Sequence, residues 1–135
     1  MDKSHAERLT PTALAFIGDA AYALYVRTRL VESTDDVCGT LHVKANAFVN
    51  ARAQAAAFDA LDAAEVFTEE EKEIARRAKN AHLHMHTKAA SVADYHRATA
   101  IEAVVGWLEV IGDHARRDEI LRLCYSAIAD KTEAT

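Results

Sequence analysis

Two acidic residues, Asp19 and Glu102, each stand alone in an apolar, helix-forming stretch of the sequence. Asp19 is the only residue charged at neutral pH from Pro11 to Val26, and Glu102 is the only one from Ala98 to Leu108. A carboxylate among apolar neighbours costs several kcal/mol unless a charge or a hydrogen bond compensates it. Two such acids suggest a shared cation, and carboxylate oxygens are the ligands that Mg²⁺ prefers. The structural alternative is that each acid points into solvent or pairs with an arginine.

Each of these acids has a glycine nearby. Gly18 directly precedes Asp19, and Gly106 follows Glu102 by four residues, which places it on the same helical face. Glycine inside a helix is less favourable than alanine by about 1 kcal/mol. We therefore expect another backbone or a ligand to approach closely at these two glycines.

The composition predicts an all-α protein, because the chain holds 29 alanines but only one proline and four glycines. Thr10 and Pro11 indicate the start of a helix that runs to about Leu30. Further helices are expected over residues 41–63, 69–80, 92–111 and 115–129, with loops over 31–39 and 81–90 and polar termini over about 1–9 and 130–135.

Caps and periodicity support these helices. Thr68 with Glu71, and Ser91 with Asp94, have the spacing of a capping box, and Gly112 is expected to end a helix. In the first long helix the core stripe is expected to consist of Leu14, Ile17, Ala21 and Leu24, with Ala15, Asp19, Tyr22 and Val26 on the adjacent stripe.

The net charge of −5 argues at first against a polyanionic partner. However, residues 74–93 contain no acid, and they hold three histidines together with Arg76, Arg77, Lys79 and Lys88. The rest of the chain therefore contains 12 of the 16 lysines and arginines and all 21 acids. Binding follows local potential, and this stretch predicts a site for a polyanion. The alternative is a solvated helix end followed by a loop.

The length of the chain predicts a single domain, and its cysteine usage predicts a protein of the reducing cytoplasm. The chain has 135 residues, its two cysteines fit no disulfide or zinc pattern, and it shows neither a membrane span nor a signal peptide. His82, His84 and His86 have alternate spacing, which zinc could use, but a polar loop that touches phosphates is the stronger interpretation.

Several motifs together resemble the ribonuclease III family. Residues 14–20, Leu-Ala-Phe-Ile-Gly-Asp-Ala, resemble its signature helix, and residues 99–106, Thr-Ala-Ile-Glu-Ala-Val-Val-Gly, resemble its second acidic motif. The similarity is closest to the Mini-ribonuclease III branch, which consists of the nuclease domain alone. Residues 48–55, 76–81 and 95–99 also look like that branch, so that the resemblance extends over residues 9–123.

The resemblance implies a ribonuclease III endonuclease-domain-like helical bundle that spans residues 1–135, lacks a double-stranded RNA-binding domain and forms a homodimer. It implies an endonuclease that cleaves double-stranded RNA with Mg²⁺, for which Mn²⁺ can substitute, and that matures the precursor of the large-subunit (23S) ribosomal RNA. Asp19 and Glu102 are then the catalytic, metal-binding carboxylates. The family's further acids are replaced by Ala15 and Thr99, which leaves fewer ligands for a second metal, and Mini-ribonuclease III sequences similarly lack the first of these acids.

In this hypothesis water attacks phosphorus in line and leaves 5′-phosphate and 3′-hydroxyl ends. Thr99 would orient a water or a carboxylate oxygen, or else bond to its own helix backbone. Tyr22 and Arg52 are further auxiliary candidates, and a ribosomal protein is a further candidate partner. The residues expected to contact RNA phosphates are Arg76, Arg77, Lys79, Asn80, Lys88 and Arg97.

Two other functions stay open on the sequence. The first is a non-catalytic RNA-binding protein of the same fold that acts in ribosome assembly. The second is an all-α nucleotide pyrophosphohydrolase, which would need clustered acids on helices. The nearest such cluster is Glu69 to Glu71, and it already has an explanation as a helix cap.

Overall fold

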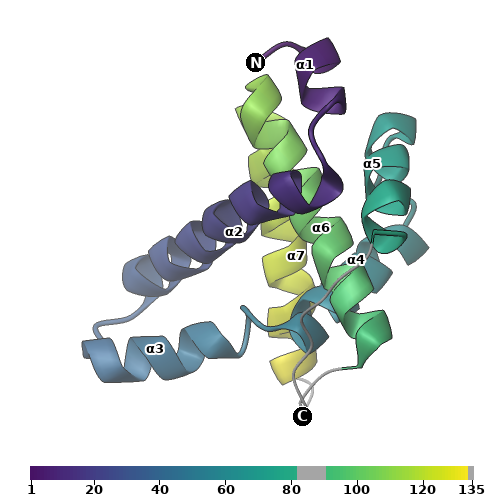
Figure 1. The fold of residues 1–135 in the computed structure, drawn as a ribbon. Helices are drawn as coiled ribbons and strands as arrows, with labels where there is room; N and C mark the ends of the chain where they lie inside the picture. Colours follow the sequence, from purple (N-terminus) through teal and green to yellow (C-terminus); the bar gives the residue numbers. More distant parts are fainter. Residues whose placement is uncertain (82–90, 134–135) are drawn as a thin grey trace.

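The structure is a computed structural model that describes residues 1–81 and 91–133, and all regular elements in these ranges are helices. The all-α prediction is therefore confirmed. The loop residues His82, His84, His86 and Lys88 lie outside the described residues. The helices of the described part are α1 (Lys3–Glu7), α2 (Pro11–Ser33), α3 (Cys38–Asn46), α4 (Ala51–Ala63), α5 (Glu69–Lys79), α6 (Val92–Ile111) and α7 (His114–Glu133) (Figure 1).

Helix α6 lies at the centre of the fold and packs against α1, α2, α4, α5 and α7 (Figure 1). Every residue from Ala98 to Leu108 is buried except Glu102, as expected of a helix covered on all sides. The predicted bounds of this helix are confirmed. Ser91 forms the capping box with Asp94, and Gly112 ends the helix with a φ of 80°, the left-handed conformation that glycine adopts most easily.

Two other predicted helix starts are also confirmed. The Thr10 side chain accepts a hydrogen bond from the Ala13 backbone N–H at 3.1 Å, with Pro11 at the first helical position. Thr68 and Glu71 form the reciprocal capping box at the start of α5. These caps satisfy backbone donors that the first helical turn leaves free.

The N-terminal segment, expected only as a polar terminus, contains the short helix α1. Asp2 caps this helix by accepting a hydrogen bond from the His5 N–H at 2.8 Å. Ala6 is fully buried against the core, which holds the helix in place. The polar composition of this segment gave no sign that Ala6 packs against the core.

The buried face of α2 differs from the predicted stripe. Leu14 is buried as expected, but the other buried positions belong to the stripe predicted to lie beside the core or to neither stripe. They are Ala15, Gly18, Tyr22, Val26 and Leu30. Leu24, predicted in the core, is 67% exposed, and Ile17 and Ala21 are only partly buried. The face that carries Gly18 turns inward because its partner, α6, approaches the α2 backbone there.

The helix predicted over residues 41–63 is two helices, α3 and α4. The break falls at residues 47–50, where Asn50 caps α4 by accepting a hydrogen bond from the Ala53 N–H at 2.9 Å. Phe48 leaves the helical path and stacks on Tyr125 of α7, with ring centroids 4.3 Å apart. An N-cap and an aromatic anchor thus override the helical propensity of this stretch.

The loop predicted over 31–39 is shorter, because α2 continues to Ser33 and α3 begins at Cys38. Helix α7 is longer than predicted at its C-terminus and reaches Glu133, beyond the point where a polar tail was expected. Within the described ranges, no helix is long and apolar enough to cross a membrane.

Candidate active site

The site is built where α2 and α6 cross with their backbones almost in contact. A Cβ atom on Gly18 would lie 1.7 Å from the carbonyl oxygen of Glu102, and one on Gly106 would lie 1.9 Å from the carbonyl oxygen of Leu14. Any larger residue at either position would collide with backbone that cannot move aside. The prediction of a close approach at these glycines is confirmed, and the crossing brings Asp19 and Glu102 together.

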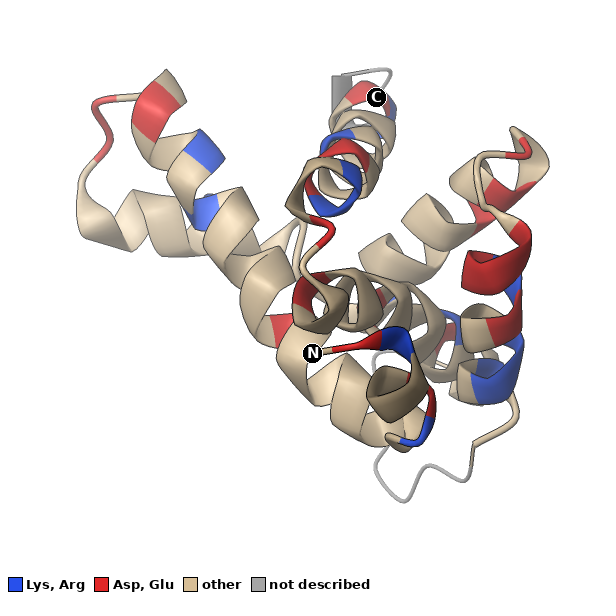
Figure 2. Ribbon diagram, turned by 90° about the horizontal axis from the view of Figure 1, so that it is seen from above, with Lys and Arg blue, Asp and Glu red and all other residues tan. Residues whose placement is uncertain are grey.

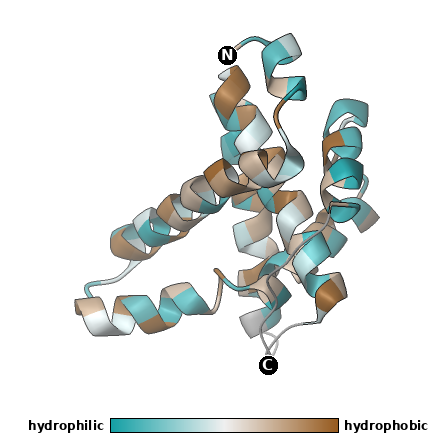
Figure 3. Ribbon diagram, viewed as in Figure 1, coloured by the Kyte–Doolittle hydropathy of each residue, from teal (hydrophilic) through white to brown (hydrophobic). Residues whose placement is uncertain are grey.

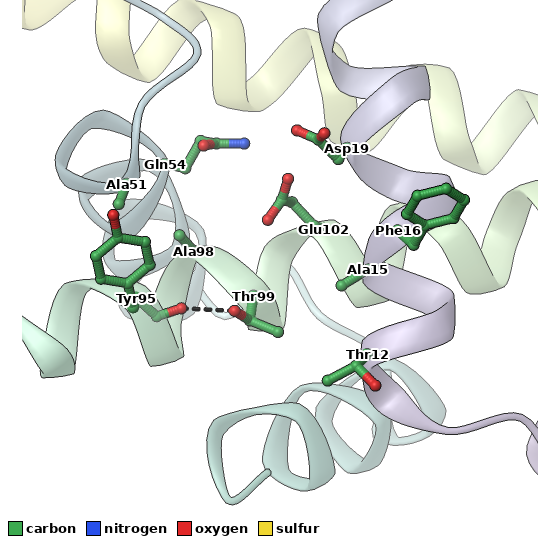
Figure 4. Close-up of a pocket in the computed structure, with 10 residues that line it drawn as sticks. All are labelled: Thr12, Ala15, Phe16, Asp19, Ala51, Gln54, Tyr95, Ala98, Thr99 and Glu102. Carbon is green, nitrogen blue, oxygen red and sulfur yellow. Dashed lines mark hydrogen bonds between the residues drawn. The ribbon is translucent and has the colours of Figure 1, made fainter. Parts of the chain in front are cut away.

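Asp19 from α2 and Glu102 from α6 line one pocket of about 460 Å³ (Figure 4). The pocket lies between α2, α4 and α6, and it is large enough for a phosphate group and a hydrated cation. The other lining residues are Thr12, Ala15, Phe16, Ala51, Gln54, Tyr95, Ala98 and Thr99. The side chains of Asp19 and Glu102 point toward the same space, as the shared-cation hypothesis requires (Figure 4).

The electrostatics of the pair show an uncompensated negative site. Burial, then the hydrogen bond and negative charge of Asp19, raise the pKa of Glu102 to about 9, while Gln54 acts in the opposite direction. No lysine, arginine or histidine is among the described residues that line the pocket. Two neighbouring carboxylates cannot both ionise at low cost, so without a cation Glu102 keeps its proton at neutral pH.

The donor set fits a hard divalent cation. Mg²⁺ commonly binds through one or two protein carboxylates, together with waters and substrate phosphate oxygens. Asp19 and Glu102 supply that number, and the described residues contain no cluster of three or more histidine, cysteine or acidic side chains that could form a closed metal cage. Waters and substrate phosphate oxygens would complete the coordination of such an ion.

The two positions where the chain departs from the ribonuclease III motifs both line the pocket. Ala15 and Thr99 are each 8% exposed. Neither side chain carries a carboxylate, so the pocket has no further acid at these two positions. The Thr99 hydroxyl donates to the Tyr95 carbonyl at 2.7 Å, which is the helix-backbone bond considered for it (Figure 4). Its lone pairs remain available to accept a hydrogen bond from a water.

The auxiliary candidates Tyr22 and Arg52 do not line the pocket. Tyr22 is 1% exposed, and its pKa is raised by burial, by Cys124 and by the charge of Glu102, which places its hydroxyl near the acid pair from within the core. Arg52 is exposed and lines a neighbouring pocket with Arg97 and Lys131. An auxiliary role for either residue stays a prediction.

The five described residues predicted to contact RNA do not line the pocket. Acidic and basic residues are interspersed along the helices of the described part (Figure 2). Arg76 pairs with Glu73 at 2.6 Å, and Arg97 pairs with Asp94 at 2.8 Å. Arg77 donates to two backbone carbonyls of the N-terminal segment, at residues 7 and 9, and thereby ties that segment to α5.

The two remaining described candidates sit at the end of α5. Lys79 lies over the ring of Phe58, with Nζ 5.1 Å from the centroid, and Asn80 is exposed. These positions leave RNA contact a prediction for all five described residues. Two of the five, Arg76 and Arg97, are held in ion pairs, and the Arg76 pair is exposed and therefore weak.

Sequence reasoning missed Gln54, which lines the pocket and is only 4% exposed. A signal for it exists in the sequence. Gln54 shares one face of α4 with Ala57, Phe58 and Leu61, at the i, i+3, i+4 and i+7 spacing of a buried stripe, and it is the only polar residue among them.

The acid cluster that a pyrophosphohydrolase would use is committed to structure. Glu71 is 1% exposed and binds Arg116 of α7 through a salt bridge of 2.8 Å. Glu70 pairs with Lys3, and Glu69 pairs with Lys72. No observation on the described residues favours that function.

Comparison with known proteins identifies the class first. Residues 12–113 match the model of the ribonuclease III domain. A crystal structure of a Fusobacterium nucleatum protein has a similar fold, with a TM-score of 0.78 and 27% sequence identity over 88% of this chain and 93% of that chain. The endonuclease-domain-like fold expected from the motifs is therefore confirmed.

Relatives narrow the assignment. The chain is 35% identical to the Mini-ribonuclease 3 of Enterococcus faecalis over 94% of this chain and 96% of the relative. It is 40% identical to the Mini-ribonuclease 3 of Symbiobacterium thermophilum over 84% of this chain and 86% of the relative. The chain belongs to the Mini-ribonuclease 3 branch of the ribonuclease III family, a family of endoribonucleases.

Proposed function

We propose that this protein cleaves double-stranded RNA with Mg²⁺, or with Mn²⁺ in its place, and that Asp19 and Glu102 are its metal-binding catalytic carboxylates. The observation that carries the proposal is the convergence of these two acids in one pocket without a basic residue among its described lining. The burial-raised pKa of Glu102 supports it, because such a site gains most from a bound cation. Family membership supplies the RNA substrate class.

The roles of the residues follow from their places. Asp19 and Glu102 would hold the cation, and the Thr99 hydroxyl, which lines the same pocket and donates to the Tyr95 carbonyl, would accept a hydrogen bond from a water there. When bound, Mg²⁺ would supply Lewis-acid chemistry at the scissile phosphate. Attack by water at phosphorus with loss of the 3′ oxygen leaves 5′-phosphate and 3′-hydroxyl ends.

The test is cleavage of a duplex RNA fragment by Asp19→Asn and Glu102→Gln. Each substitution should lower the rate at least about 100-fold, which corresponds to about 2.7 kcal/mol of transition-state stabilisation. Asp62→Asn and Glu32→Gln are matched controls on exposed positions of α4 and α2, and they should cleave at the wild-type rate. Undiminished cleavage by Asp19→Asn would reject this site. Duplex binding without nicks by the wild type would favour the non-catalytic alternative, and pyrophosphate release from a nucleotide would favour the pyrophosphohydrolase.

The RNA contacts are proposed on Arg76, Arg77, Lys79, Asn80, Lys88 and Arg97. Duplex RNA is recognised largely through its backbone and shape, so these contacts should position it with little sequence choice. Arg76→Ala should weaken duplex binding uniformly across sequences and reduce its dependence on salt concentration. Unchanged binding and an unchanged salt slope would remove Arg76 from this set.

We further propose that the substrate is the 23S ribosomal RNA precursor, processed in the cytoplasm. The Mini-ribonuclease 3 relatives support this choice through the branch to which the chain belongs. Primer extension across the ends of 23S RNA should detect unprocessed precursor in cells that lack the protein. Adding purified large-subunit ribosomal proteins to the cleavage assay tests whether one of them is a partner.

We propose that the protein is a homodimer that buries the outer face of α2. Hydrophobic residues recur along this helix (Figure 3), and Leu24 and Val31 are 67% and 61% exposed. Ile17, Ala21 and Leu24, which sequence periodicity placed in a core, line a groove with Leu121 of α7, and three charged residues line it as well, namely Glu109, Arg117 and Asp118. A second copy would bury the stripe that the monomer leaves exposed. Leu24→Glu should yield a folded monomer by light scattering, and an unchanged dimer mass would exclude this face.

A further inference from the structure

Gln54 is a polar residue at a buried position of α4 where an apolar side chain would be expected. It lies one turn into α4 and is 4% exposed, while the other buried residues of that helix are Ala55, Ala57, Phe58 and Leu61. An apolar residue would pack at this position without any polar group to satisfy. The side chain instead reaches the pocket, and its amide nitrogen points toward the carboxylates of Asp19 and Glu102 (Figure 4).

The Gln54 amide nitrogen is buried and makes no hydrogen bond of good geometry with the described residues, although Gln54 lies close enough to Glu102 to lower the pKa of that carboxyl. A buried donor without a partner destabilises a protein, and native structures contain few of them. Gln54 is also the only side chain with N–H donors among the described residues that line the pocket. The Gln54 amide nitrogen and the two carboxylates therefore lie in the same pocket, where the N–H groups can donate to a carboxylate oxygen.

We propose that Gln54 is a positioning residue that donates a hydrogen bond from Nε2 to the Glu102 carboxylate and fixes its orientation toward Asp19. The inference rests on the proposed function, because it concerns how the acid pair is held for a cation. Glu102 reaches the pocket through a flexible side chain, so one fixed hydrogen bond removes orientations that cannot bind jointly with Asp19. Partners of this kind around ligating carboxylates typically change metal affinity or activity about 10- to 100-fold when they are removed.

The test replaces Gln54 with methionine, which keeps the length of the side chain and removes both N–H donors. Equilibrium Mn²⁺ binding, followed by the electron paramagnetic resonance signal of the free ion, is measured together with cleavage kinetics and thermal unfolding. The expected result is an increase of about tenfold or more in the Mn²⁺ dissociation constant and a similar fall in kcat. The KM for the duplex should stay within a factor of two, and the unfolding temperature without metal should be unchanged or higher.

The control is Asp62→Met, which introduces the same side chain on the exposed side of α4 and should match the wild type in all four measurements. Mn²⁺ affinity and kcat of Gln54→Met within twofold of the wild type would overturn the proposal. If Gln54→Met does not fold, Gln54→Leu takes its place, and failure of both to fold would assign Gln54 to the core and also overturn it. A wild type that neither binds Mn²⁺ nor cleaves RNA would instead refute the proposed function itself.

Discussion

The proton held by Glu102 should compete directly with the metal ion. The pKa of this carboxyl lies near 9 because of burial and of Asp19, whereas a divalent cation binds the ionised form. At pH 7 the group is two pH units below its pKa, so ionising it costs about 2.7 kcal/mol and lowers the apparent metal affinity about 100-fold. The apparent association constant should therefore rise about tenfold for each pH unit up to pH 9 and level off above it.

The assay is Mn²⁺ binding by isothermal titration calorimetry at pH 6.5, 7.5 and 8.5 in buffers of different ionisation enthalpy. The buffer dependence should show about one proton released for each ion bound at pH 7.5, because Glu102 is protonated at that pH and a divalent cation binds its ionised form. An affinity that changes less than twofold between pH 6.5 and 8.5, with no proton released, would refute the electrostatic reasoning.

The same proton makes a second, metal-free measurement informative. The folded protein keeps Glu102 protonated up to about pH 9, whereas the unfolded chain ionises this group near its ordinary pKa of 4.5. The folded state therefore binds more protons, and this contribution favours folding less and less as pH rises from about 4.5 to about 9. At pH 7 Glu102→Gln should raise the free energy of unfolding by at most about 3 kcal/mol, an upper limit because the side chain is partly solvated.

Three substitutions outside the acid pair test the packing and capping described above. Gly18→Ala should destabilise the protein by about 3 kcal/mol or more in urea unfolding, because its Cβ would meet the Glu102 backbone at 1.7 Å, and wild-type stability would contradict the backbone contact. Arg116→Met should cost about 3 to 5 kcal/mol, since it leaves Glu71 buried without its partner, and a loss under 1 kcal/mol would mean that Glu71 finds water. Asn50→Ala should cost about 1 kcal/mol through the lost cap, measured in the same way.

The sequence predicted the parts of this fold that local chemistry determines. Threonine and serine at the right spacing before a helix cap its first turn, and the structure confirms the caps predicted at Thr10, Thr68 and Ser91. The two lone acids were equally visible, because a charge in an apolar helix is costly unless something compensates it. The expectation that Gly18 and Gly106 mark a close approach is confirmed for the same reason, since glycine in a helix interior needs a steric cause.

Other features depend on partners that periodicity cannot name. The 3.6-residue spacing along α2 defines two candidate stripes but does not show which of them faces α6. The close approach of α6 at Gly18 decides it, because it buries the face beside the stripe that periodicity favoured. The break before α4 depends on Phe48 finding Tyr125, which lies 77 positions later in the chain. Gln54 was missed because its meaning comes from the two acids on other helices, although its polarity on a buried stripe was detectable.

The arrangement of the site separates its chemistry from its substrate binding. The two carboxylates come from helices whose backbones approach closely at Gly18 and the Glu102 carbonyl, so this backbone contact fixes how far apart the two side chains begin. Two of the cations expected to bind RNA lie instead in ion pairs away from the crossing, Arg76 in an exposed pair on α5 and Arg97 in a half-buried pair on α6. The exposed pair on α5 can change partners at little cost. Substitutions at Arg76 or Arg97 should therefore change affinity for the duplex, whereas only changes around the crossing of α2 and α6 should change how tightly the acid pair holds a metal ion.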